Sequence, residues 1–255
     1  MTAPHLRNAL LRLAFWLAVA SAWAFSGCTS VMAVDTRAQA ERYQSVIESP
    51  VRTEQDRKMD PSRHPAEFVP FTQVRPGMRV LDVSAGAGYT SQLLALAVGP
   101  TGMVWAQAPQ PGATLQKRVA DHPQANLVVV AARPFDDPVP DEATKLDLIT
   151  IVLNYHDISY MSVDRAQMNR KLYAALKPGG RLVVIDHSAL KRTGISAGKT
   201  LHRIDEDVVL AEVKQAGFVL DAEGDFLRNP ADPRNESSNQ PKVPTDKFAL
   251  RFVKP

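Results

Sequence analysis

Three histidines in the second half of the chain each stand close to a carboxylate. The pairs are His156 with Asp157, His187 with Asp186, and His202 with Asp205. Imidazole titrates near neutral pH and a neighbouring carboxylate can fix its tautomer, so these pairs suit proton transfer. We predict His156 as a general base with Asp157 as its catalytic partner. The same residue types suit a divalent metal, but their spacing matches no zinc signature, and no metal is predicted.

A second candidate site is a turn of small residues at positions 82–88. It follows the aliphatic run 79–83 and precedes the run 89–98, which indicates a strand, a tight turn and a helix. Gly86 and Gly88 lack a Cβ, so the backbone can adopt φ > 0 and a ligand can lie against main-chain N–H groups at a helix N-terminus. The spacing differs from the dinucleotide fingerprint Gly-x-Gly-x-x-Gly, which disfavours a nucleotide-dependent oxidoreductase.

Alternating strands and helices must position these residues. Apolar runs predict further strands at residues 104–107, 126–131, 146–153, 181–186 and 218–220. Helices are predicted near residues 113–121, 163–176 and 205–215, and residues 247–253 are expected to form an antiparallel edge strand. Unbroken apolar strands separated by helices indicate a parallel sheet covered on both faces. Ligands bind beyond the carboxyl ends of such strands, so both candidate sites are expected in loops at one edge.

Two segments carry a family resemblance. The turn at residues 82–88 and the sequence Leu-Lys-Pro-Gly-Gly-Arg-Leu-Val-Val at residues 176–184 resemble the first motif and the post-helix signature of class I S-adenosylmethionine (SAM) methyltransferases. Ser84 stands where the motif has its first glycine. The resemblance spans roughly residues 66–253. It implies an α/β, doubly wound, Rossmann-like sheet of seven strands, mostly parallel with an antiparallel last strand.

The resemblance also implies a cofactor site for SAM at the ends of the first four strands. Its predicted members are Asp82, Ser84, Gly86, Gly88, Gln107, Phe135 and Asn154. Gln107 stands where the family usually has an acidic residue for the ribose hydroxyls, and its amide can still form hydrogen bonds. Phe135 would cover the adenine ring or pack against the core.

The remaining site residues are predicted to act on the substrate. Tyr155 and Asn154 would line the methyl-transfer channel, so Tyr155 joins the catalytic candidates. His187, His202 and Arg203 are the candidates for substrate binding.

The activity that this resemblance implies is methyl transfer from SAM to an unidentified small molecule. Four segments resemble more narrowly a subgroup of exported bacterial proteins described as predicted methyltransferases, namely residues 153–157, 186–189, 201–205 and 227–230. The alternative is a non-catalytic binding protein of the cell envelope that has the same fold. SAM is made in the cytoplasm, so an exported enzyme would lack an obvious supply of its cofactor.

Residues 1–33 are predicted as a signal peptide. Two arginines precede an uncharged apolar run, and small residues follow it. Phe25-Ser26-Gly27-Cys28 resembles a lipobox, which would make Cys28 a lipid-anchored residue, and Val31-Met32-Ala33 offers a second cleavage site. A retained membrane anchor is the third interpretation. We therefore expect an exported protein, either periplasmic or lipid-anchored in the envelope.

Charge and composition limit the partners. The signal segment holds Arg7 and Arg12 and no acid, and the rest of the chain has 28 Lys and Arg against 27 Asp and Glu. A nearly neutral domain gives no support for nucleic-acid binding by a basic surface. The single cysteine excludes an internal disulfide. A small-molecule substrate is the only partner predicted.

The domain organisation follows from these segments. Residues 34–65 are predicted as an N-terminal extension or a lid, in which Asp60, Arg63 and His64 would face the ligand. Residues 66–255 are predicted as the methyltransferase-like domain.

Overall fold

The computed structural model describes residues 37–255, so the predicted signal peptide and Cys28 lie outside the described residues. The chain divides into two units, Met1–Ser45 and Val46–Pro255. Residues 37–48 are helical. No helix within residues 37–255 has the length and apolar character needed to span a bilayer. The description below concerns the second unit.

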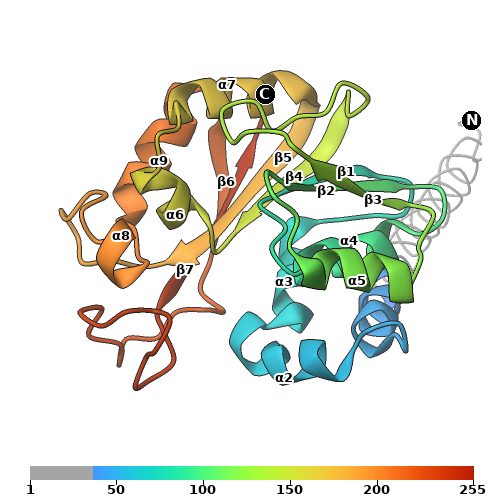
Figure 1. Cartoon of the computed structure of the whole chain (residues 1–255), viewed down its shortest axis with the longest axis horizontal. Coiled ribbons are helices and arrows are strands. Elements are labelled where there is room, and N and C mark those ends of the chain that lie inside the picture. Colours follow the sequence, from blue (N-terminus) through green and yellow to red (C-terminus); the bar gives the residue numbers. More distant parts are fainter. Residues whose placement is uncertain (1–36) are drawn as a thin grey trace, which may run out of the picture. The chain divides into compact units, whose positions relative to one another are not determined.

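A sheet of seven strands forms the centre of this unit (Figure 1). The strands are β1 (Arg79–Val83), β2 (Met103–Ala108), β3 (Leu127–Ala131), β4 (Leu146–Val152), β5 (Leu176–His187), β6 (Val219–Gly224) and β7 (Lys247–Val253). Their order is β3-β2-β1-β4-β5-β7-β6. The first five strands pair in parallel, and β7 is antiparallel to both of its neighbours. The predicted fold class is confirmed.

Helices cover both faces of the sheet. They are α2 (Glu54–Arg63), α3 (Pro65–Thr72), α4 (Tyr89–Val98), α5 (Ala113–Asp121), α6 (Tyr155–Tyr160), α7 (Arg165–Ala175), α8 (Gly198–Leu201) and α9 (Glu206–Gln215). Figure 1 shows α3, α4 and α5 against one face and α6, α7 and α9 against the other. Such two-sided cover buries most residues of the central strands β1, β4 and β5, as a parallel sheet requires, whereas the edge strands β3 and β6 keep exposed residues.

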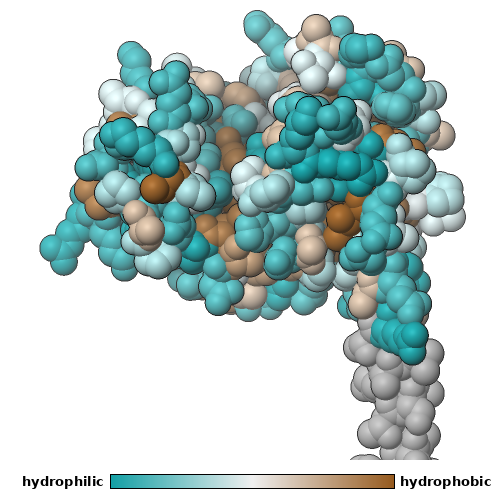
Figure 2. Space-filling view, turned by 90° about the horizontal axis from the view of Figure 1, so that it is seen from below, coloured by the Kyte–Doolittle hydropathy of each residue, from teal (hydrophilic) through white to brown (hydrophobic). Residues whose placement is uncertain are grey.

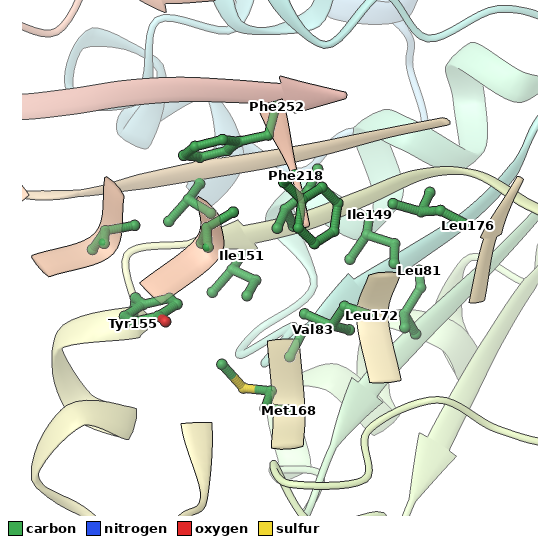
Figure 3. Packing of buried hydrophobic residues seen from close by; sticks show 14 of the residues in the cluster. Leu81, Val83, Ile149, Ile151, Tyr155, Met168, Leu172, Leu176, Phe218 and Phe252 are labelled. Carbon is green, nitrogen blue, oxygen red and sulfur yellow. The ribbon is translucent and has the colours of Figure 1, made fainter. Parts of the chain in front are cut away.

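Side chains of alternate residues along β1 serve the two faces. Leu81 and Val83 belong to the main apolar cluster, where they meet Met168 and Leu172 of α7 (Figure 3). Asp82, between them, points to the face covered by α4. Because successive side chains of a strand point to opposite faces of the sheet, β1 places the carboxylate of Asp82 beside the glycine turn and packs Leu81 and Val83 into the core on the other face.

Two expectations about local structure were wrong. The three histidines were expected in loops, but His156 lies in the short helix α6 and His202 directly follows the short helix α8. Strand β5 was expected to begin at Arg181, yet it begins at Leu176 and includes Gly180, and its pairing with β4 shifts register there. A Cβ at Gly180 would lie 3.0 Å from the carbonyl oxygen of Leu146, so only glycine permits this close approach of the two strands.

Candidate active site

The glycine turn has the backbone that the motif predicts. Ser84, Gly86 and Gly88 have φ of 58°, 56° and 83°. Ser84 therefore keeps the left-handed conformation of the glycine it replaces, at a cost of roughly 1–2 kcal/mol. A Cβ on Gly88 would lie 2.7 Å from Leu115, whereas one on Gly86 would meet only the carbonyl oxygen of Ser84 at 4.0 Å. Gly88 is thus required for packing, and Gly86 leaves the surface of the turn open to a ligand.

Asp82 is fixed beneath this turn by two hydroxyl groups. Its carboxylate accepts hydrogen bonds from Ser91 at 2.5 Å and from Thr150 at 2.7 Å. The side chain is buried, and this burial raises the pKa of Asp82 to about 6. Both oxygens have partners within the protein, so the carboxylate holds the turn to β4 and α4.

Gln107 makes hydrogen bonds within the protein, and its contact with the ribose stays a prediction. The side chain is fully buried, and its carbonyl oxygen accepts a hydrogen bond from the Ser84 N–H at 3.0 Å. Its amide nitrogen donates to the Arg133 carbonyl at 2.8 Å. Both ends are therefore engaged, and Gln107 ties the glycine turn to the loop after β3. In that loop Phe135 packs against the apolar cluster, while Asn154 lies half-buried at the end of β4.

An arginine of α5 forms a hydrogen bond with the main chain of the glycine turn. Arg118 of α5 donates to the Ala87 carbonyl at 2.7 Å and makes two hydrogen bonds to the carboxylate of Asp56 in α2, at 2.8 and 2.6 Å. Sequence reasoning missed this pair, because a charged residue on an amphipathic helix is usually exposed. Tyr89, the first residue of α4, donates to Asp60 at 2.7 Å. These contacts attach α2 to the glycine turn.

The three histidines come together at the carboxyl ends of β4 and β5, as predicted. The ring of His156 lies 5.9 Å from that of His187 and 5.6 Å from that of His202, measured between ring centroids. His156 Nδ1 lies 2.6 Å from Asp186, and its Nε2 lies 3.2 Å from Asp157. His202 Nδ1 lies 2.9 Å from the same Asp157 oxygen.

The two carboxylates decide the charge of His156. Burial alone would lower its pKa, but hydrogen bonds to Asp157 and Asp186 raise the pKa of His156 to about 9. Burial alone would raise the pKa of Asp157, but the hydrogen bond and the charge of His156 hold the pKa of Asp157 well below its usual range. At neutral pH His156 already carries the proton that a general base would have to accept. This geometry gives no support to the predicted base role, which stays a prediction.

Two other predicted site residues are engaged in the interior. The Tyr155 hydroxyl donates to Glu212 at 2.7 Å and accepts from Asn169 at 2.8 Å, and the ring belongs to the core (Figure 3). Arg203 is fully buried and pairs with Asp232 at 2.7 Å. These contacts are structural: Tyr155 joins α6 to α7 and α9, and Arg203 holds the long segment before β7.

A groove of about 820 Å³ opens at the same edge of the sheet. Its walls are the second half of α2, the end of β5 with His187, and residues 226–247. Arg63 and Lys247 lie in the groove beside apolar side chains that include Met59, Leu153, Phe226, Leu227 and Val243. On the face shown in Figure 2, brown apolar surface lies between hydrophilic side chains.

Arg63 and Lys247 are cations without an ion-pair partner among residues 37–255. The Arg63 guanidinium lies 5.8 Å from the centre of the Tyr89 ring, and the Lys247 ammonium reaches the Thr245 carbonyl at 3.3 Å. Burial lowers the pKa of Arg63, and burial together with Arg63 lowers the pKa of Lys247 to about 8. The same surroundings lower the pKa of His187, mainly through burial, so its imidazole is neutral. Sequence reasoning named Arg63 but missed Lys247, which reads as an ordinary strand residue.

The fold and the turn define a class I methyltransferase: a seven-stranded sheet with an antiparallel β7 and a glycine turn after β1. Solved structures agree on the fold. A SAM-dependent methyltransferase from Aquifex aeolicus aligns with a TM-score of 0.58 and 22% identity over 79% of this chain and 97% of that one. A second, from Mesorhizobium loti, aligns with a TM-score of 0.53 and 15% identity over 74% and 96%.

The profile of the ubiE/COQ5 methyltransferase family matches residues 66–203, and the chain belongs to this family. It is 30% identical over 116 residues to the ubiquinone/menaquinone biosynthesis C-methyltransferase UbiE of Burkholderia multivorans. The corresponding protein of Cupriavidus metallidurans is 31% identical over 119 residues. In both cases the alignment covers 45% of this chain and 45% of the relative, so the chain spans about half the length of the curated relatives it matches.

Proposed function

We propose that this chain transfers the methyl group of SAM to a small molecule that has an anionic group and an apolar body. The observation that carries the proposal is a pair of cations without an ion-pair partner among residues 37–255. The half-buried Arg63 and the buried Lys247 lie in one apolar groove, and Arg63 reaches the ring of Tyr89, the residue that follows the glycine turn. Burying a cation without a counter-charge is unfavourable, so a groove of this kind favours an anionic ligand. Arg63 would hold a carboxylate through two N–H groups and Lys247 as a point charge.

The residues at the turn fit the cofactor, which supplies the reactive methyl group when bound. Gly86 and Ala87 are exposed, and the left-handed φ angles at Ser84, Gly86 and Gly88 give a ligand access to the main chain. Gln107 would keep the turn in shape from the interior. The cavity between Arg63, Thr90 and Leu153 measures only about 10 Å³, room for about one water. We propose that the end of α2 shifts to admit a cofactor there, as a lid would.

The charge of the site also bears on the acceptor. Methyl transfer requires a nucleophile aligned with the methyl group, and a weak acid must lose a proton first. Both ring nitrogens of His156 face carboxylates, Nδ1 that of Asp186 and Nε2 that of Asp157, so neither is free to take a proton from an acceptor. A carboxylate acceptor needs no base, because it is ionised before it binds. The site thus positions an anion without having to remove a proton.

The test combines binding with methyl transfer. Calorimetry of the purified chain with SAM and with its demethylated product should show binding of both. Transfer of a labelled methyl group should then be measured for apolar carboxylic acids and their neutral amides. We expect the acids to react, and Arg63→Gln or Lys247→Gln to raise KM for them at least tenfold, about 1.4 kcal/mol. Lys117→Gln, at an exposed position of α5, is the matched control.

Two results would contradict the proposal in different ways. No heat with either form of the cofactor would favour the non-catalytic binding protein. If the cofactor binds and acids and amides are turned over equally, the chain would be a methyltransferase, but the proposal of an anionic acceptor would be wrong.

A further inference from the structure

The contact between α6 and α8 creates a cluster of metal-ligating side chains beside the groove. His156 and Asp157 come from the first turn of α6, and His202 follows α8 directly. One ligand atom from each of the three lies within 4.8 Å of the other two. We propose that His156, Asp157 and His202 bind one divalent transition-metal ion, with zinc the best match.

The donor set argues for this class of ion. Two imidazole nitrogens and one carboxylate oxygen are the ligands that zinc uses at sites with an open fourth position. Magnesium and calcium prefer oxygen ligands, so the two imidazoles select against them. The three side chains already converge, because His156 Nε2 and His202 Nδ1 both approach Asp157 Oδ1, at 3.2 and 2.9 Å.

The surroundings of His156 resemble the outer shell of a metal site. Its Nδ1 lies 2.6 Å from the fully buried Asp186, which leaves Nε2 on the side of Asp157 and His202. A histidine that binds a metal usually donates its other ring N–H to a carboxylate, which fixes the ring and raises its basicity. Asp186 is itself oriented, since it accepts the main-chain N–H groups of His156 and His187, each at 2.8 Å.

The backbone holds the third ligand in place. Gly198 of α8 lies so close to α6 that a Cβ would stand 2.9 Å from the His156 carbonyl oxygen. His202 then adopts φ of 51° and brings its ring back toward Asp157. An ion can enter from outside, because the side chains of Asp157 and His202 are each 27% exposed. The separation of the ligands along the chain explains why no spacing motif revealed the site.

The experiment uses the tag-free purified chain after treatment with a chelator. Calorimetry should show one strong site for Zn²⁺ and no comparable heat with Mg²⁺, and bound Co²⁺ should give the intense visible bands of a four-coordinate ion. His202→Asn removes a ligand but tolerates the left-handed backbone. We expect it to weaken Zn²⁺ binding at least 100-fold, and Asp186→Asn to weaken it about 10- to 100-fold. His122→Gln, a histidine at the end of α5 and outside the cluster, should bind as the wild type does.

The outcomes separate this inference from the proposed function. Equal Zn²⁺ affinity in the wild type and His202→Asn, with an unchanged melting temperature of the variant, would overturn the metal site. The same conclusion would follow if the wild type bound no Zn²⁺, and the cluster would then be a hydrogen-bonded network only. Binding of Zn²⁺ is measured without SAM or substrate, so it does not depend on methyl transfer.

Discussion

At the scale of single residues, the polar groups of the glycine turn mostly shape the site. Asp82 and Gln107 were predicted as cofactor ligands because they end β1 and β2, and they do lie at that edge. Yet Asp82 accepts hydrogen bonds from Ser91 and Thr150. Gln107 forms hydrogen bonds with the main chain of Ser84 and Arg133. The exposed main chain at Gly86 is left as the open part of the turn.

Asp82 should make stability depend on pH in an unusual direction. Its folded pKa is about 6 against 3.8 for a free carboxyl, so between these values the folded state binds more protons than the unfolded state. The free energy of unfolding should therefore fall as pH rises from 4 to 6, by up to about 1.4 kcal/mol per pH unit, and stay lower above pH 6. Asp82→Asn should raise the melting temperature at pH 7 and leave it nearly unchanged at pH 4.

Thermal melts at four pH values between 4 and 7 would test this, with Asp121→Asn on the exposed face of α5 as the control. A variant that is less stable than the wild type at pH 7 would show that the buried carboxylate is ionised and stabilising.

At the scale of elements, α2 is linked to the glycine turn through Arg118 and lines the groove. Thr53 and Asp56 form a capping box at its start, and Asp56 also pairs with Arg118 beneath the glycine turn. Its last residue, Arg63, lies in the groove. The helix thus connects the glycine turn, through Asp56 and Arg118, to the wall of the groove, and its role as a lid stays a prediction.

Asp56→Ala should loosen this connection. It would leave the buried Arg118 guanidinium without its carboxylate, and breaking such a pair costs about 3–5 kcal/mol. We expect urea unfolding at a lower midpoint and faster amide exchange in α2 and in residues 84–92. Glu54→Ala, at an exposed position of the same helix, is the matched control and should change neither. Uniformly faster exchange across the whole sheet would mean general destabilisation and would contradict the specific link.

At the scale of the whole molecule, the family and fold are established, while the cellular address remains a prediction from residues 1–33. We propose lipid anchoring at Cys28, the only cysteine in the chain. Labelled palmitate fed to cells that express the full chain should be incorporated into the wild type and not into Cys28→Ser. The variant should also move from the membrane fraction to the periplasmic fraction. An unlabelled wild type would favour the cleavage site after Ala33 or a retained anchor.

The sequence alone determined the order of strands and helices, the glycine turn and the family. The elements and the turn rest on local periods and on the backbone freedom of particular residues, and both can be read along the chain: α5 and β7 have the predicted bounds. The family was indicated by the resemblance of residues 82–88 and 176–184 to known motifs. The short helices α6 and α8 were missed because four to six residues are too few to show a helical period, and tertiary contacts stabilise them.

Only the tertiary structure decided which polar groups are available to a ligand. Arg203, Tyr155 and Gln107 are residue types that often line sites, but each forms hydrogen bonds with a partner from a distant segment of the chain. Arg63 and Lys247 lie far apart in sequence and meet in one groove, and His156 receives its charge from Asp157 and Asp186. Burial and charge pairing depend on neighbours in space, and those neighbours are set by how the sheet and its helices pack.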